Sequence, residues 1–143
     1  MITEMQSRIG PHPLHAILLA FPVALFPAGL ATDITYLNTA EIQWTNFSSW
    51  LNAGALLFGG PVLLWALINS VRLRRSPLHS RALVYLVAVA AMWILGLINA
   101  FKHSGDGWSS VGTGGLILSL LSALLALAAG WIAFSTRGVG RNA

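Results

Sequence analysis

Residues 12–36 read HPLHAILLAFPVALFPAGLATDITY, and this stretch decides the fold of the chain. It contains an uncharged run from Leu14 to Thr32. At about 1.5 Å per residue, a helix of this length crosses the roughly 30 Å hydrocarbon core of a bilayer. Pro22 and Pro27 interrupt a segment that a simple anchor would leave unbroken. We therefore predict a membrane span that also has a functional role.

One face of this predicted helix carries titratable groups at both of its ends. Spacings of three and four residues place the following side chains on that face: His12, His15, Leu19, Pro22, Phe26, Gly29 and Asp33. Ionisable groups within membrane spans are rare and usually mark function. The two histidines and the aspartate are therefore the first candidate site residues.

The composition excludes a soluble domain and several kinds of site. Hydrophobic residues make up 56% of the 143 residues and charged residues only 8%, against about a quarter charged in soluble domains. The absence of cysteine excludes disulfides, iron–sulfur clusters held by thiolates and a covalently attached c-type haem. The net charge of +4 does not indicate nucleic-acid binding, because the basic residues lie beside the apolar runs.

Three further apolar runs complete the predicted fold, an all-α bundle of four transmembrane helices in one integral membrane domain, residues 1–143. The predicted spans are about 13–36, 49–72, 80–102 and 111–135. Residues 38–47 are expected to form a polar connection. No cleavage site with an A-x-A pattern follows the first span at the right distance, so this span is expected to be an uncleaved anchor.

Small and aromatic residues in the later spans predict how the helices pack. A kink or a close helix contact is expected at Gly59-Gly60-Pro61. Close packing is expected at Gly112, Gly114, Gly115 and Gly130, and hydrogen bonds between helices at Ser119 and Ser122. Packing or lipid contact is expected for Trp65, Trp93 and Trp131.

The charged residues predict the orientation in the membrane. Four crossings place these arginines on one side: Arg8, Arg72, Arg74, Arg75, Arg81, Arg137 and Arg141. The other side has Lys102 together with Asp33, Glu41 and Asp106. By the positive-inside rule, the arginine side is cytoplasmic. We therefore expect a multi-pass protein of the cell inner membrane with both termini in the cytoplasm.

The order of residues in the first span resembles a known family of small membrane proteins, domain-of-unknown-function family 2231. The resemblance lies in His12, Pro13, Leu14, His15, Phe21, Pro22, Asp33 and Tyr36, and in Ser49-Trp50-Leu51 with Gly54. Some members have a histidine directly before Phe-Pro, where this chain has Ala20. The resemblance implies a four-helix integral membrane protein. Because some members are fused or adjacent to dehydrogenases, it also implies a dehydrogenase or another membrane-complex subunit as a partner.

The arginine side offers the groups that a b-type haem needs. His15, or His12 one turn earlier, begins the first span and His79 begins the third at a comparable depth. Two such imidazoles are axial ligands for one haem b, and Arg81 and its neighbours are cations for the propionates. A transition metal held by His12 and His15 would also need His79. The alternative is that these histidines are ordinary interfacial residues, half in and half out of the headgroup layer.

The opposite side has a second candidate cluster, Asp33 and His103, with Asn99 one turn before His103. A histidine beside a carboxylate can accept and pass protons, and a quinol headgroup could be oxidised there. Asp106 lies in a Gly-Asp-Gly sequence and is better explained as a turn residue.

These observations favour an electron-transfer or quinol-interacting subunit with one haem b. The contrasting hypothesis is a structural or assembly subunit of a larger membrane complex without a cofactor. A small transporter or channel would need oligomerisation, because four helices leave little space for a pore. No phosphate-binding loop or nucleophile motif supports kinase or hydrolase chemistry.

Overall fold

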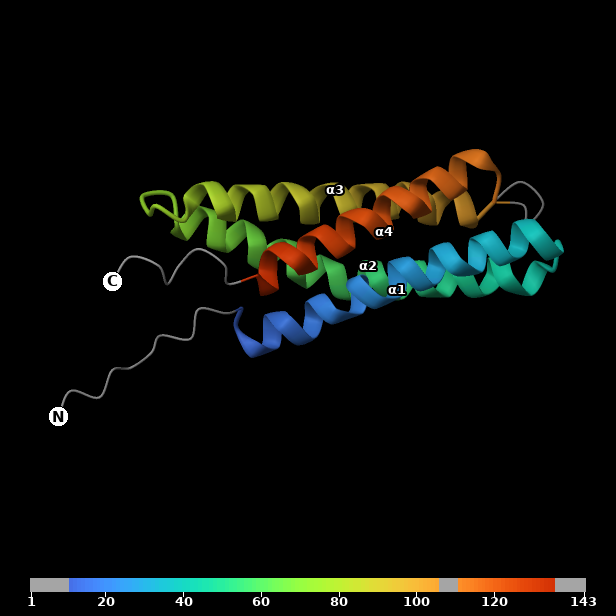
Figure 1. Ribbon diagram of the computed structural model, residues 1–143, viewed down its shortest axis with the longest axis horizontal. Helices are drawn as coiled ribbons and strands as arrows, with labels where there is room; N and C mark the ends of the chain where they lie inside the picture. The colour runs from blue at the N-terminus through green and yellow to red at the C-terminus, as the bar shows by residue number, and fades with distance from the viewer. Residues whose placement is uncertain (1–10, 106–110, 136–143) are drawn as a thin grey trace.

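The computed structural model describes residues 11–105 and 111–135, which form four helices in an antiparallel bundle (Figure 1). The helices are α1 (Pro13–Thr39), α2 (Ile42–Arg72), α3 (His79–His103) and α4 (Thr113–Phe134). Each is long and apolar enough to cross a membrane. The predicted fold class, an all-α bundle of four candidate spans, is confirmed.

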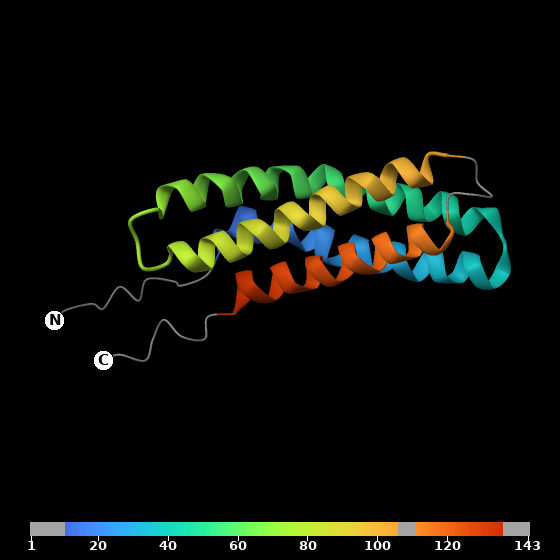
Figure 2. The same cartoon turned by 90° about the horizontal axis from the view of Figure 1, so that it is seen from above.

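Adjacent helices in the chain are also adjacent in space, and α4 closes the bundle by packing against α1. Helices α1 and α3 therefore lie diagonally across the bundle (Figure 2). The start of α1, the α2–α3 turn and the end of α4 share one end, which we call the arginine end because it contains Arg72, Arg74, Arg75 and Arg81. We call the opposite end, where α1 leads into α2, the Asp33 end.

The polar connection predicted for 38–47 is much shorter than expected. Asn38 and Thr39 complete α1, and α2 begins at Ile42, so that only Ala40 and Glu41 connect the two helices. Ala40 has a left-handed backbone with φ 57°, and its N–H donates to the carbonyl of Tyr36. This left-handed residue ends α1 and reverses the chain within two residues. The prediction was wrong because the polar residues of 42–47 lie on a helix that extends beyond the apolar run.

The buried face of α1 is the face predicted from the spacing of its residues. His15, Leu19, Pro22, Phe26, Gly29 and Asp33 are all buried, together with Thr32 and Tyr36. The core between the two ends is apolar and includes Leu19, Phe26, Val62, Val89, Met92 and Ala126. Large apolar side chains such as Leu57, Trp50 and Trp131 are exposed, as expected of a bundle surrounded by lipid.

The predicted glycine contacts are confirmed at some positions and not at others. A Cβ atom at Gly59 would lie 3.3 Å from the Trp93 ring, and one at Gly130 would lie 3.1 Å from Val23. A Cβ atom at Gly112 or Gly114 would meet no atom of the described residues within 4 Å. The described residues therefore give no close contact at these two exposed glycines, which lie at the N-cap and in the first turn of α4.

Candidate functional site

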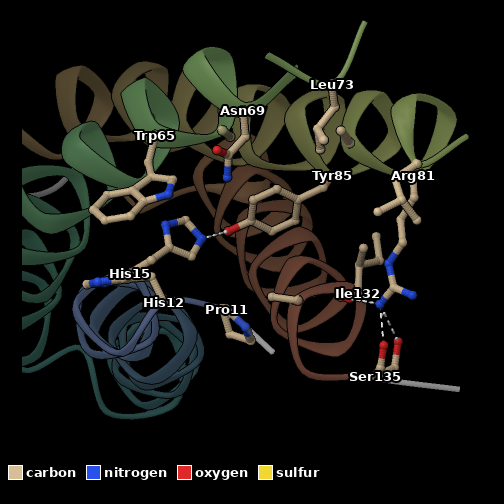
Figure 3. A pocket seen from close by; sticks show the side chains of 14 residues that line it. Pro11, His12, His15, Trp65, Asn69, Leu73, Arg81, Tyr85, Ile132 and Ser135 are labelled. Atoms are coloured by element: carbon tan, nitrogen blue, oxygen red, sulfur yellow. Dashed lines mark hydrogen bonds between the residues drawn. The ribbon is translucent and has the colours of Figure 1, made fainter. Parts of the chain in front are cut away.

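A cavity of about 280 Å³ lies at the arginine end between the ends of the four helices (Figure 3). Residues of every helix line it, among them His12, His15, Trp65, Asn69, Arg81, Tyr85, Ile132 and Ser135. The predicted site residues His12, His15 and Arg81 therefore share one cavity. His79 begins α3 at the same end but does not belong to this lining.

His15 is the central polar group of the cavity. Its side chain is buried, with 4% of the residue exposed, and its Nε2 lies 2.7 Å from the hydroxyl of Tyr85 on the diagonal helix. Its Nδ1 is also buried and has no hydrogen-bond partner in the described part of the chain. One ring nitrogen is thus held by Tyr85, and the other is buried without a partner among the described residues (Figure 3).

An indole ring forms the aromatic wall beside these histidines. The ring centroid of Trp65 lies 5.4 Å from that of His12 and 5.4 Å from that of His15. His12 itself is exposed, and its Nδ1 accepts a hydrogen bond from the backbone N–H of Leu14 at 3.2 Å. His12 therefore caps the start of α1, while His15 points into the bundle.

Arg81 joins α3 to the end of α4. Its guanidinium donates to the carbonyl of Ile132 at 2.7 Å and also to the carbonyl of Ser135. Carbonyls at the end of a helix have no partner within the helix, so this guanidinium satisfies α4 as a cap does. All of these bonds use Nη2, so Arg81 is a wall of the cavity that is tied to α4 through one of its three side-chain nitrogens.

The predicted His15–haem–His79 arrangement does not match this geometry. Two axial imidazoles must face one another across the macrocycle, whereas Nε2 of His15 faces Tyr85 and His79 is not a lining residue. Within the described ranges, no group of three or more His, Cys, Asp or Glu side chains could hold a metal ion. The haem and metal assignments of His15 and His79 stay predictions.

Three lining residues were not predicted as site residues from the sequence. Trp65 was expected to pack or face lipid, and Asn69 and Tyr85 were given no role. Trp65 and Asn69 are four residues apart and share a face of α2, and Tyr85 follows Arg81 by four residues on α3. Helical spacing placed each pair on one face, but it could not show that both faces meet His15.

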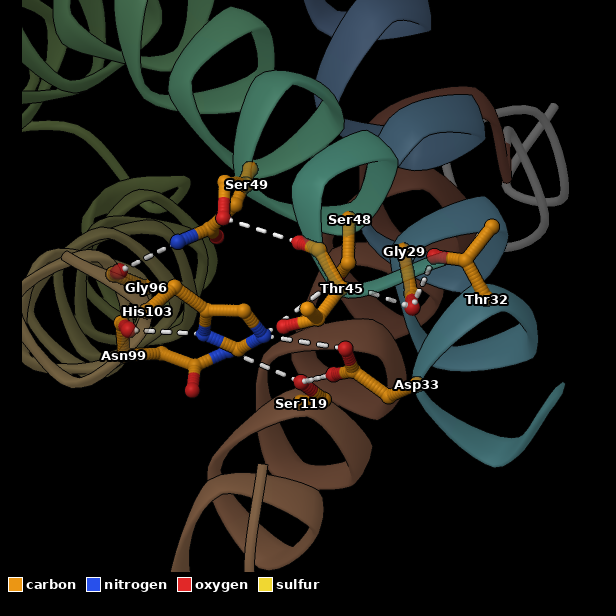
Figure 4. Close-up of polar contacts among 11 residues, drawn as sticks. Gly29, Thr32, Asp33, Thr45, Ser48, Ser49, Gly96, Asn99, His103 and Ser119 are labelled. Atoms are coloured by element: carbon orange, nitrogen blue, oxygen red, sulfur yellow. Dashed lines mark hydrogen bonds and ion pairs between the residues drawn. The ribbon is translucent and has the colours of Figure 1, made fainter. Parts of the chain in front are cut away.

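A second polar site lies at the Asp33 end and is closed (Figure 4). Asp33 on α1 is fully buried, and its Oδ1 lies 2.9 Å from Nε2 of His103 on α3. Nδ1 of His103 donates to the carbonyl of Asn99 at 2.9 Å. The structure thus brings together two predicted site residues that are 70 positions apart in the chain. Asp106 lies outside the described residues.

Side chains of α2 and α4 complete this group. The Ser119 hydroxyl donates to Oδ2 of Asp33 and accepts from the Asn99 amide at 2.8 Å. The Ser48 hydroxyl lies 3.3 Å from Nε2 of His103. We call these residues the Asp33 network: Asp33, Ser48, Asn99, His103 and Ser119. All are buried, so the network joins four helices through polar contacts inside an apolar bundle.

Comparison with known proteins identifies the family but not an activity. No curated protein and no solved structure matches the chain. A family model described as "Predicted membrane protein (DUF2231)" matches residues 11–134, which covers all four helices and both polar sites. The chain is therefore a member of the DUF2231 family of predicted membrane proteins.

Proposed function

We propose that this membrane protein is a quinone-interacting subunit that binds a quinone headgroup in the cavity at the arginine end. The observation that carries the proposal is the buried His15–Tyr85 pair, with its unpartnered Nδ1, in a cavity of a membrane-spanning bundle. We further propose that the arginine end faces the cytoplasm of a bacterial-type inner membrane, because Arg72, Arg74 and Arg75 lie there and Lys102 lies at the other end.

The lining suits a flat ring with carbonyl oxygens. A quinone headgroup offers hydrogen-bond acceptors at its edges and an apolar face. One hydrogen of the His15–Tyr85 pair lies between Nε2 and the hydroxyl oxygen, so the pair has one further hydrogen to donate, from Nδ1 of His15 or from the Tyr85 hydroxyl. Asn69 is a second donor, and the Trp65 indole is a surface for stacking. Binding cavities typically combine an apolar lining with a few such polar groups. The isoprenoid tail of the quinone would extend into the lipid beside the bundle.

The chemistry requires a partner that supplies electrons. A quinone takes up two electrons and two protons to become a quinol, and no side chain in this cavity is an electron donor. The electrons would come from a dehydrogenase subunit bound at the same end. The protons would reach the quinone oxygen through the His15–Tyr85 pair, since both side chains carry exchangeable hydrogens.

Fluorescence of the single indole in the cavity provides the test. A short-chain quinone should quench the emission of the protein in nanodiscs with a saturable component, and Trp65→Phe should abolish that component. Trp131→Phe is the matched control, because Trp131 lies near the same end but is 70% exposed and does not line the cavity. A quench that is not saturable, or that is unchanged by Trp65→Phe, would contradict the proposal and leave the structural or assembly subunit.

A visible spectrum of the same samples tests the haem prediction. A reduced-minus-oxidised haem band that disappears in both His15→Ala and His79→Ala would replace the quinone proposal with a haem-binding electron-transfer subunit.

The orientation in the membrane is tested separately, using the absence of native cysteine. A membrane-impermeant thiol reagent applied outside intact cells should label Ser104→Cys and not Ser80→Cys, and the reverse pattern would overturn the orientation.

A further inference from the structure

The Asp33 network is not used by the proposed function. It lies about 27 Å from His15 along α1, at the other end of the bundle. Inside a membrane, a carboxylate and an imidazole are expensive to bury unless they are paired and hydrogen-bonded. The arrangement of their hydrogen bonds therefore indicates which protons the network holds.

The partners fix the direction of most hydrogen bonds. A backbone carbonyl only accepts, so Nδ1 of His103 must carry a hydrogen to bond Asn99. The Ser119 hydroxyl accepts from the Asn99 amide and donates to Oδ2 of Asp33. A single proton then lies between Oδ1 and Nε2, on either atom. The pair is net neutral in both forms, which explains how it can be buried.

Three buried oxygens beside the network have no partner among the described residues: Oδ1 of Asn52, Oδ1 of Asn99 and Oγ of Ser122. They belong to α2, α3 and α4 but lie at a similar depth along the bundle. Asn52 donates to the carbonyl of Gly96, which is one turn from Asn99. Ser122 is one turn from Ser119, which bonds Asn99.

Lipid cannot satisfy these oxygens. A polar group buried without a partner costs free energy, and buried water commonly supplies the missing hydrogen bonds. Because the three residues are 3%, 3% and 0% exposed, solvent at the surface does not reach them. Water bound inside the bundle would give each oxygen a partner and would lie next to Ser119 and Asp33.

We propose that the Asp33 network and this internal water form a buried proton-binding site near the Asp33 end, with the internal water as its route to the aqueous phase. The bound water takes up one proton from the aqueous phase and transfers one proton to Oδ2 of Asp33. The protonated Oδ2 then donates to the Ser119 oxygen, and the Ser119 hydroxyl hydrogen turns to the bound water. His103 keeps both ring hydrogens and continues to donate to Oδ1. The site thus changes from net neutral to a charge of +1.

Among residues 11–105 and 111–135, few other charged groups face the site. Helix α1 contributes Asp33 itself and the buried phenol of Tyr36 one turn later. Glu41 precedes α2, and Lys102 is exposed beside His103 on α3; between Thr113 and Phe134, α4 has no charged residue. The proton equilibrium is therefore set mainly by Asp33, His103 and the water that they contact.

Infrared difference spectroscopy of the full chain in nanodiscs tests the proposal. The C=O stretch of a protonated carboxyl group should appear as the pH is lowered from about 8 to about 4, a range that reaches the ordinary pKa of aspartic acid. The band should shift in D₂O, disappear in Asp33→Asn and remain in Glu41→Gln, the exposed acid at the same end. Ser122→Ala should shift the band, because it removes one water contact.

Two results would overturn the proposal: no Asp33-dependent band at any pH in this range, or an Asp33-dependent band whose intensity does not change with pH.

Water-edited solid-state NMR of the unmodified protein covers the case in which Asp33→Asn fails to fold. Magnetisation should pass from water to Asn52 and Ser122 and not to Val62 or Val89, which are 0% exposed in the apolar core. No transfer to Asn52 or Ser122 would mean that the network is dry, and would also overturn the proposal.

The two proposals fail independently. The quinone test depends on Trp65 and the cavity, whereas the infrared test depends on Asp33, which does not line that cavity. A saturable quench without a titrating carboxyl supports the quinone and overturns the proton site. The opposite pair of results supports the proton site alone.

Discussion

The two ends of the bundle use the same residue types in different ways. At the arginine end, His15 on α1 meets Tyr85 on α3 beside a cavity and keeps one ring nitrogen without a partner. At the Asp33 end, both ring nitrogens of His103 are bonded, and four helices close around the pair. In both cases a histidine links the diagonal helices, which the backbone alone does not bring together.

The difference shows how a small membrane bundle separates binding from cohesion. A polar group that is fully bonded ties helices together, because lipid offers no competing partner. A polar group that is half bonded beside a cavity is positioned for a ligand. The following predictions test whether the Asp33 end is the cohesive end and the arginine end the binding end.

The largest effect is expected for Asp33→Ala. The substitution leaves His103 and Ser119 without their buried acceptor, and removing one partner of a buried ion pair typically costs about 3–5 kcal/mol. Reversible unfolding in mixed micelles measures this loss of the free energy of unfolding. Glu41→Ala is the control and should change it by less than about 0.5 kcal/mol, as is usual for exposed residues.

A double variant sharpens this result. In Asp33→Ala/His103→Leu neither charge remains. The double variant should therefore lose less free energy of unfolding than the two single variants lose together. Additive losses would show that the two side chains act separately. The Asp33 end would then not be a single closed network.

The contrast between the ends also explains what the sequence could predict. The charge-free runs were sufficient to predict four spans. The spacing of residues from His15 to Asp33 was sufficient to predict the buried face of α1. The pairing of Asp33 with His103 followed from topology, since an even number of crossings places the end of the first span beside the end of the third. The cavity was not predictable in this way, because Trp65 and Tyr85 gain their role only from how helices rotate against one another. The short α1–α2 connection was missed because hydropathy marks the membrane boundary and not the helix end.

Arg81→Ala should have the next largest effect, at the arginine end. It removes a charged donor from the carbonyls of Ile132 and Ser135, and hydrogen bonds to charged groups contribute about 1.5–3 kcal/mol. The loss should be local, so hydrogen exchange should increase over residues 130–135 while α1 is unchanged. Arg74→Ala, an exposed arginine of the α2–α3 turn, is the control. Equal effects of the two variants would mean that the Arg81 cap does not hold α4.

Gly96→Ala tests whether the two ends are coupled. A Cβ atom there would lie 2.6 Å from Cζ and 2.8 Å from Cε1 of the buried Phe26 ring, so the ring or the helices must shift. Overpacking of this kind costs about 1–3 kcal/mol. Gly114→Ala, where no atom of the described residues lies within 4 Å, should be neutral or stabilising by up to about 1 kcal/mol.

The same variant, Gly96→Ala, also tests the coupling of the two ends. Because the Gly96 carbonyl accepts from Asn52, the infrared band of Asp33 should shift while quinone quenching stays unchanged. A change in both would show that the ends are coupled through α3.

The smallest change in stability is expected for Tyr85→Phe, and it is the most informative about the cavity. The ring still fills its place, but His15 loses the partner of its Nε2, and a typical hydrogen bond contributes about 0.5–1.5 kcal/mol. The free energy of unfolding should fall by this amount, far less than for Asp33→Ala.

The same variant tests quinone binding. If the His15–Tyr85 pair orients His15 toward a bound quinone, the dissociation constant measured by Trp65 quenching should rise by about 2-fold to 10-fold in Tyr85→Phe. His79→Gln should leave that constant unchanged, because His79 lies outside the cavity lining. A loss of stability with no change in quinone binding would make the His15–Tyr85 pair a second cohesive contact, and the functional difference between the two ends would disappear.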